Sequence, residues 1–65
     1  MSDDPTDYLR AVYPLGSLWR MKSNGETCKI TRVTDTGLDL VLRLECGWWH
    51  VYRTTLEMLT DFERL

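Results

Sequence analysis

Trp48, His50 and Tyr52 stand at every second position of one short segment. Alternate side chains of an extended strand point to the same side, so these three are expected to share one face of a sheet. Arg43, from the apolar run before them, is expected beside them. Tryptophan, tyrosine and arginine dominate the energetic centres of protein interfaces. This set, named the aromatic face below, therefore predicts binding to a protein partner or to a second copy of the chain.

A second candidate site consists of basic side chains on the first two predicted strands: Arg20, Lys22, Lys29 and Arg32. Hairpin pairing is expected to place Arg20 opposite Lys29, where like charges repel each other. A phosphate or an acidic protein surface would relieve this repulsion. Nucleic-acid binding is therefore an alternative function. It would be strengthened by Trp48 or Tyr52 on the same surface, because stacking combined with phosphate contacts holds single strands.

No pattern in the sequence predicts catalysis or a bound cofactor. Cys28, Cys46 and His50 lack the close spacing that a structural zinc site requires. No nucleophile is expected to meet His50 together with an orienting carboxylate. No glycine-rich loop precedes a helix as it does in phosphate-binding motifs. We therefore expect neither an enzyme nor a metal-binding protein.

The strands that must carry the two sites are marked by their turns. Asn24-Gly25 is typical of a two-residue type I′ hairpin, because both residues tolerate positive φ angles. This turn predicts strands at about 17–22 and 26–33. The expected apolar pairs are Trp19 with Ile30 and Met21 with Cys28.

The next run, residues 38–45, alternates between leucine and other residues. Its period of two places the leucines inward: Leu38, Leu40, Leu42 and Leu44. A second tight turn at Cys46-Gly47 then puts Trp49 and Val51 on the leucine side, which leaves the aromatic face outward. A loop one residue longer would turn every side chain over and bury His50 and Tyr52 instead.

The N-terminal segment has the signals of a short helix. Asp4-Pro5 is typical of a helix start, and Pro14 and Gly16 end it. A helix of this length needs a surface to pack on. Its apolar side chains, which are Tyr8, Leu9 and Val12, either fold back across the aromatic face or leave it free to bind a partner. In an intermediate case the helix exchanges between protomers, or the aromatic face self-associates as a dimer.

The C-terminal segment begins with Thr54 and Glu57, which have the spacing of a capping box and predict a helical turn. Residues 56–65 then either continue as a helix or return as a short fifth strand. The periodicity of the segment favours neither alternative.

With 65 residues, 43% of them hydrophobic, the chain is expected to form one domain over 1–65. Neither a membrane-spanning run nor a signal-peptide pattern is found, so we expect a cytoplasmic protein. Both cysteines are then expected to remain thiols. The net charge is −2, although residues 17–53 carry six basic and four acidic side chains. This distribution favours an anionic partner.

The chain predicts four meandering strands joined by tight turns, a helical turn after the fourth strand and room for a fifth. This plan resembles the SH3-like small β-barrels. The resemblance covers about residues 15–60. It implies a mainly β fold of four or five antiparallel strands, preceded by a helical segment at 1–14. Many small accessory proteins of bacteria and their phages are of this type.

A narrower part of the chain resembles the plasmid-borne type II dihydrofolate reductases. Leu15-Gly16, Arg20 and Lys22-Ser23 match the Leu-Gly-x-x-x-Arg-x-Lys-Ser start of that family, and Val51-Tyr52 resemble the end of its Val-Gln-Ile-Tyr motif. The chain departs from the family at three positions: Met21 replaces a lysine, His50 replaces the glutamine and Val51 replaces the isoleucine. The resemblance implies, as a further alternative, an oligomeric reductase with a pore shared by four subunits.

Overall fold

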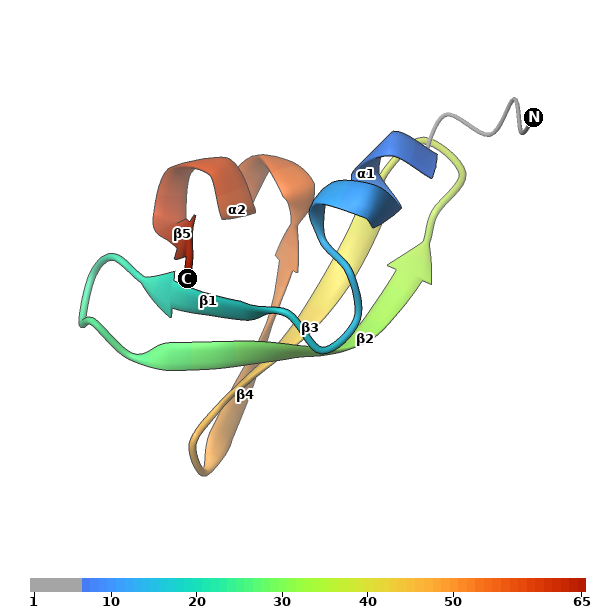
Figure 1. The fold of residues 1–65 in the computed structure, drawn as a ribbon. Coiled ribbons are helices and arrows are strands. Elements are labelled where there is room, and N and C mark those ends of the chain that lie inside the picture. Colours follow the sequence, from blue (N-terminus) through green and yellow to red (C-terminus); the bar gives the residue numbers. More distant parts are fainter. Residues whose placement is uncertain (1–6) are drawn as a thin grey trace.

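A computed structural model describes residues 7–65 of the chain. Its elements are α1 (Asp7–Val12), β1 (Leu18–Met21), β2 (Thr27–Asp35), β3 (Leu40–Cys46), β4 (Trp49–Thr54), α2 (Thr55–Asp61) and β5 (Phe62–Arg64). All strands are antiparallel neighbours in one five-stranded sheet with the order β4-β3-β2-β1-β5. The predicted mainly β fold is confirmed, whereas β4 and β5 do not pair with each other and the sheet stays open (Figure 1). The predicted helix start at Asp4-Pro5 lies outside the described residues.

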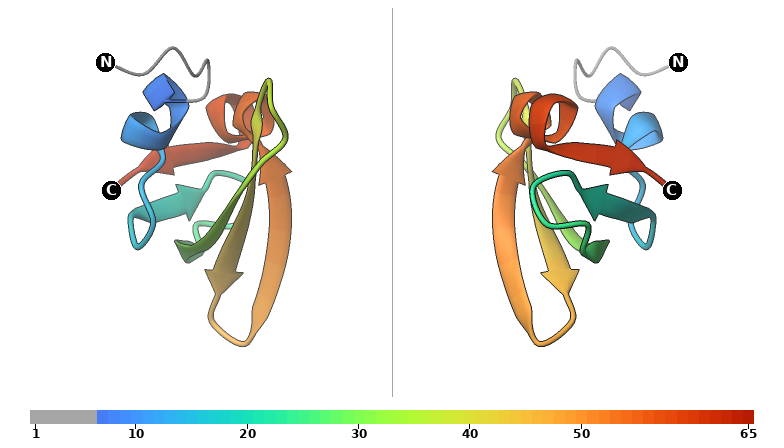
Figure 2. Two further views of the ribbon diagram at one scale, coloured as in Figure 1. Left: turned by 90° about the vertical axis from the view of Figure 1, so that its right-hand side faces the viewer. Right: turned by 90° about the vertical axis from the view of Figure 1, so that its left-hand side faces the viewer.

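The sheet is strongly curved, with both helices over one end and the β3–β4 hairpin extending from the other (Figures 1 and 2). Leu40, Leu42 and Leu44 are fully buried, as predicted, and Met58 of α2 packs on the same core. The inward placement predicted for Leu38 is wrong, because its side chain is 86% exposed. Its exposure follows from a turn at 36–39, held by a bond from the Thr36 N–H to the Asp39 carbonyl (3.0 Å), so that β3 begins only at Leu40.

Helix α1 packs on this core and not on the aromatic face. Leu9 and Val12 contact the core residues, and the ring of Tyr13 lies 5.1 Å from that of Trp19. An ion pair between Arg10 and Asp35 (2.9 Å) ties the helix to the end of β2. Of the alternatives that the sequence left open, the structure therefore excludes the one in which this helix covers the aromatic face.

The turn between β1 and β2 is longer than predicted. Gly25 has a φ of +75°, but Asn24 does not adopt a positive φ, so the predicted type I′ turn is wrong. Asn24 instead accepts a bond from the Glu26 N–H through its side-chain oxygen (2.9 Å), a local bond typical of asparagine in turns. The register moves by two residues as a result: Trp19 pairs with Cys28 and Arg20 with Thr27.

The turn between β3 and β4 is Gly47-Trp48 and not the predicted Cys46-Gly47, since Cys46 pairs with Trp49. Gly47 has a φ of +72°, which fits a type II′ turn with glycine at its first central position. This shift is again two residues, so the predicted faces are kept. Val51 contacts the core, while His50 and Tyr52 are exposed.

Cys28 and Cys46 form a disulfide between β2 and β3. The prediction that both remain thiols is wrong. It came from the expected compartment alone, whereas the sheet brings the two residues opposite each other with Cα atoms 4.3 Å apart. Both cysteines are buried, so the disulfide is part of the core.

The capping box at the start of α2 is confirmed. The Glu57 N–H donates to Thr54 Oγ1, and the Thr54 N–H donates to Glu57 Oε1 (2.9 Å). The bonds from the backbone N–H and the hydroxyl of Thr54 hold the pKa of Glu57 below its usual value. Residues 56–65 combine both alternatives that the sequence left open, because a helix to Asp61 is followed by strand β5.

We expect reduction of the Cys28–Cys46 disulfide to lower the free energy of unfolding by about 2–4 kcal/mol, because the link closes a loop of 18 residues in the unfolded chain. Urea unfolding of the oxidised and the reduced protein measures this difference. The double variant Cys28→Ala/Cys46→Ala should be insensitive to reductant. Equal stability of the oxidised and reduced protein would contradict the prediction.

Acidification should weaken α2 through Glu57. A lowered pKa means that the carboxylate stabilises the fold fully above the usual glutamate pKa, and that this contribution is lost as the pH falls through the lowered value. In Glu57→Ala we expect a lower melting temperature at neutral pH and a smaller fall on acidification than in the wild type. Thermal unfolding across the acidic range tests this, and parallel curves for the two proteins would refute it.

Candidate functional site

The aromatic face lies on the outer side of the sheet, at the β3–β4 hairpin. His50 pairs with Glu45 and Tyr52 with Arg43 across the two strands. The rings of His50 and Tyr52 meet edge to face with their centroids 5.6 Å apart. Tyr52 is 52% exposed, and Trp48, at the tip of the hairpin, is 95% exposed. The structure thus brings Arg43, His50 and Tyr52 together, places Trp48 in the adjoining turn, and leaves the three aromatic side chains exposed.

A break in the ladder of β2 adds Arg32 to this surface. The register between β2 and β3 shifts between Ile30 and Arg32, so that Arg32 pairs with Arg43. Residues opposite each other in a sheet share one face. Tyr52, Arg43 and Arg32 therefore form one row across three strands, named the cross-strand row below.

The sequence contained a signal for this row that the analysis of single strands missed. Cys28 and Ile30 are buried at even positions of β2, whereas the next core contact of the strand, Val33, stands at an odd position. Such a change of parity within one strand indicates a bulge, because one residue is inserted into one side of the ladder. Thr31 is the inserted residue here, and its hydroxyl lies 3.5 Å from the Arg43 carbonyl oxygen.

Arg43 is the half-buried member of the cross-strand row. Its Nε atom is covered and has no hydrogen-bond partner within the described part of the chain. Two guanidinium groups in opposed positions repel each other, and a covered N–H without an acceptor costs free energy. A carboxylate or phosphate oxygen near Arg32 and Arg43 would offset the repulsion between the two guanidinium groups.

The four basic residues of the second predicted site are not one cluster. Arg20 forms an ion pair with Glu63 of β5, in which Arg20 Nε donates to Glu63 Oε1 (2.6 Å). Lys29 pairs with Glu45 across β2 and β3, so the predicted pairing of Arg20 with Lys29 is wrong. Lys22 lies in the turn and lines a separate hollow. Only Arg32 therefore joins the aromatic face without an acidic neighbour in its own cross-strand pair.

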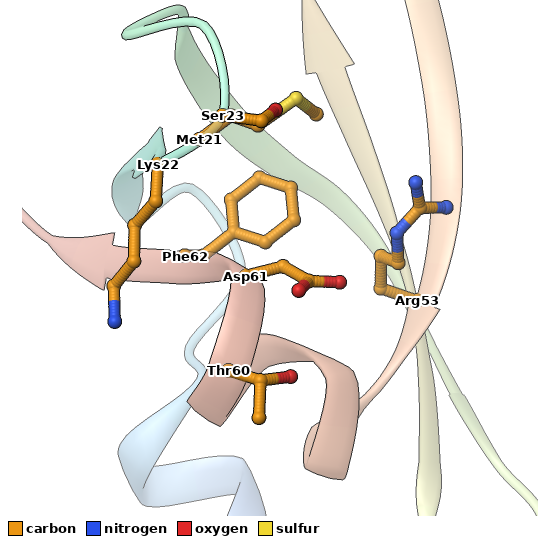
Figure 3. Close-up of a pocket in the computed structure, with 7 residues that line it drawn as sticks. All are labelled: Met21, Lys22, Ser23, Arg53, Thr60, Asp61 and Phe62. Atoms are coloured by element: carbon orange, nitrogen blue, oxygen red, sulfur yellow. The ribbon is translucent and has the colours of Figure 1, made fainter.

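This hollow, of about 420 Å³, lies between the end of β4 and the segments around the end of α2 (Figure 3). Met21 and Phe62 form its apolar part, and its polar lining includes Lys22, Arg53 and Asp61. Arg53 pairs with Leu42, which places its side chain on the core side of β4. Its guanidinium donates to the Tyr52 carbonyl oxygen (2.8 Å) at the free edge of the strand. Sequence analysis missed this hollow, because it depends on how the ends of the open sheet approach each other.

The residues that resemble the type II dihydrofolate reductases are separated in the structure. Lys22 and Ser23 line the hollow, while Val51 contacts the core and Tyr52 is on the outer face. In the described part of the chain, no three histidine, cysteine, aspartate or glutamate side chains gather as a metal site would require. No helix within residues 7–65 combines the length and the apolar composition needed to span a membrane.

Comparison with known proteins gives no relative at any level. No family model matches the chain, and neither a curated protein nor a solved structure does.

Proposed function

We propose that this chain is a non-enzymatic interaction module that binds a protein partner through the aromatic face, which consists of Trp48, His50, Tyr52 and Arg43. The observation that carries the proposal is the exposure of a tryptophan and a tyrosine on one hairpin, beside a half-buried arginine. Soluble monomers seldom leave large aromatic side chains grouped and bare. Such residues supply most of the binding free energy of protein interfaces.

The cross-strand row narrows the chemistry of the partner. Arg32 and Arg43 would receive a carboxylate, which offsets the repulsion between the two cations. Trp48 and Tyr52 would pack on apolar groups near that acid. The partner surface expected from this geometry is therefore an acidic side chain flanked by hydrophobic ones.

We also propose that the fold is an SH3-like small barrel. The meander of β1 to β4, the bulge in β2 and the short helix before β5 support this assignment. A barrel of this class presents its outer face and its turns to partners, which is where the aromatic face lies. An accessory protein of a bacterium or phage remains our prediction for its cellular setting. The cytoplasmic location predicted from the sequence conflicts with the Cys28–Cys46 disulfide, because disulfides are rare in that compartment.

Single-stranded nucleic acid is the second candidate ligand, and one specific observation favours it. Tyr52 shares the cross-strand row with Arg43 and Arg32, so a base could stack while phosphates contact the two cations. The acidic neighbours of Arg20 and Lys29 weaken this candidate, because Glu63 and Glu45 repel a phosphate backbone.

The partner-binding proposal predicts that Trp48→Ala loses a partner that the wild type captures from cells of its native source. The exposed indole makes no contact that the fold requires, so the variant should unfold at nearly the same temperature. Leu38→Ala is the matched control, because Leu38 is also a large exposed apolar residue but lies in a different turn. We expect Leu38→Ala to retain the partner and Arg43→Ala to lose it.

Quantitative mass spectrometry of the captured proteins measures this outcome. Removing one central aromatic side chain of an interface costs about 2 kcal/mol or more, which is roughly a thirtyfold loss of affinity. Identical partner sets for the wild type, Trp48→Ala and Arg43→Ala would reject the aromatic face as the binding surface.

For the second candidate, we expect the affinity for a single-stranded oligonucleotide to fall steeply with added salt and to be reduced by Tyr52→Ala. Each phosphate contact releases counterions, so two arginine contacts give a log–log salt slope of about −1.4. Fluorescence anisotropy from low to physiological salt measures the slope. No binding at low salt would remove nucleic acid from the candidates and leave the protein partner.

A further inference from the structure

We infer that β4 is a self-pairing edge, on which a second copy of this chain docks through its own β4 in antiparallel orientation. The inference goes beyond the proposed function, because it concerns the backbone edge of the hairpin and not its aromatic side chains. No other strand of the described chain pairs with the outer edge of β4. The hairpin also extends away from the remainder of the molecule, which leaves this edge accessible (Figures 1 and 2).

The register identifies which backbone groups point to the free edge. Cys28 and Cys46 have Cα atoms 4.3 Å apart, the spacing of a pair that exchanges no backbone hydrogen bonds. The backbone groups of Cys46 then point toward β4 and pair with Trp49. Because this pattern alternates along a strand, the groups of His50 and Tyr52 point away from β3.

A hydrogen bond of the Arg53 side chain agrees with this assignment. The carbonyl of Tyr52 accepts a bond from Arg53 Nη1, which requires that the carbonyl faces away from the ladder. The exposed guanidinium can be displaced by a stronger backbone donor. The N–H and the carbonyl of His50 and the N–H of Tyr52 have no backbone partner in the ladder that β4 forms with β3.

The side chains of β4 suit a second copy better than a partner with a charged edge strand. Arg53 is the only residue of β4 with a formal charge at neutral pH, so two copies meet without opposed like charges. Natural proteins place charged residues on an edge strand to prevent it from pairing with another chain. The composition of β4, rich in aromatic and branched residues, is typical of a strand that pairs.

Antiparallel pairing about Val51 gives each side chain a complementary neighbour. His50 of one copy then lies opposite Tyr52 of the other on the outer face, and each such pair exchanges both backbone hydrogen bonds. Trp49 of the second copy lies opposite Arg53 on the core side, where a cation–π contact can form. This places the indole beside the hollow lined by Arg53 and Phe62.

Pairing through a single strand of six residues buries less surface than the roughly 1,200–2,000 Å² of stable interfaces. The dimer should therefore be weak and form within the micromolar to millimolar range. Sedimentation equilibrium of the full chain over this range should give masses that rise from the monomer toward the dimer.

His50→Pro tests the edge, because proline removes the N–H that points outward while the ladder with β3 keeps its bonds. We expect at least a roughly tenfold weaker dimer than in the matched variant His50→Ala, since two outward backbone bonds are lost from the symmetric interface. Thermal unfolding shows whether each variant is folded. Equal dimerisation of His50→Pro and His50→Ala, or a monomeric wild type at millimolar concentration, would overturn the inference.

Hydrogen exchange provides a test that needs no variant. In the wild type, protection of the His50 and Tyr52 amides should rise with protein concentration, while the protection of Thr34 should not. Unchanged exchange at both amides across the dimerisation range would overturn edge pairing.

Trp48→Ala separates this inference from the proposed function. The variant should lose the captured partner yet dimerise with unchanged affinity, because Trp48 lies in the turn beyond the paired strand. Loss of the dimer in Trp48→Ala but not in His50→Pro would show that copies associate through the aromatic face and would refute the β4 edge. Failure of partner capture with an intact dimer would instead reject only the proposed function.

Discussion

Leu40, Leu42 and Leu44 are fully buried, and their burial determines which residues of the neighbouring strands reach solvent. Burying a leucine side chain stabilises a fold by about 1.5–3 kcal/mol. A one-residue slip of β3 would expose all three, at a cost comparable with the entire stability of a small domain. The inward side of β3 is therefore fixed, and the outward position of Arg43 follows from it. Tyr52 is outward because it pairs with Arg43.

This constraint explains which predictions from the sequence succeeded. Both hairpin registers differ from the predicted ones by two residues. A two-residue shift preserves the face of every side chain, since the period of a strand is two. Buried and exposed positions, including Val51 inside and Tyr52 outside, could therefore be predicted without the correct turns. The charged pairs depend on the exact partner, and the predicted pairing of Arg20 with Lys29 failed for this reason.

The remaining differences come from contacts between segments far apart in the sequence. Lys22 donates its N–H to the Asp61 carbonyl (2.8 Å), so the end of α2 helps to set the turn after β1. The Cys28–Cys46 disulfide and the pairing of Arg32 with Arg43 both require the register between β2 and β3. No local pattern around Arg43 indicates its partner. The parity change between Ile30 and Val33 is the one local signal of the bulge, and it becomes informative only when the strand is treated as continuous.

The small core also explains why the aromatic face is free. Leu9 and Val12 of helix α1 contact the core, and Arg10 forms an ion pair with Asp35. If helix α1 packed on the aromatic face instead, it would cover Arg43, whose charge is costly to bury without a partner. Because α1 packs on the core, the β3–β4 hairpin can make contacts both through its exposed aromatic side chains and through the backbone edge of β4. The side chain of Tyr52 points outward from the sheet and that of Trp48 is exposed in the turn, whereas the backbone groups at the edge of β4 lie in the plane of the sheet. A partner on the face and a strand at the edge therefore do not compete for the same atoms.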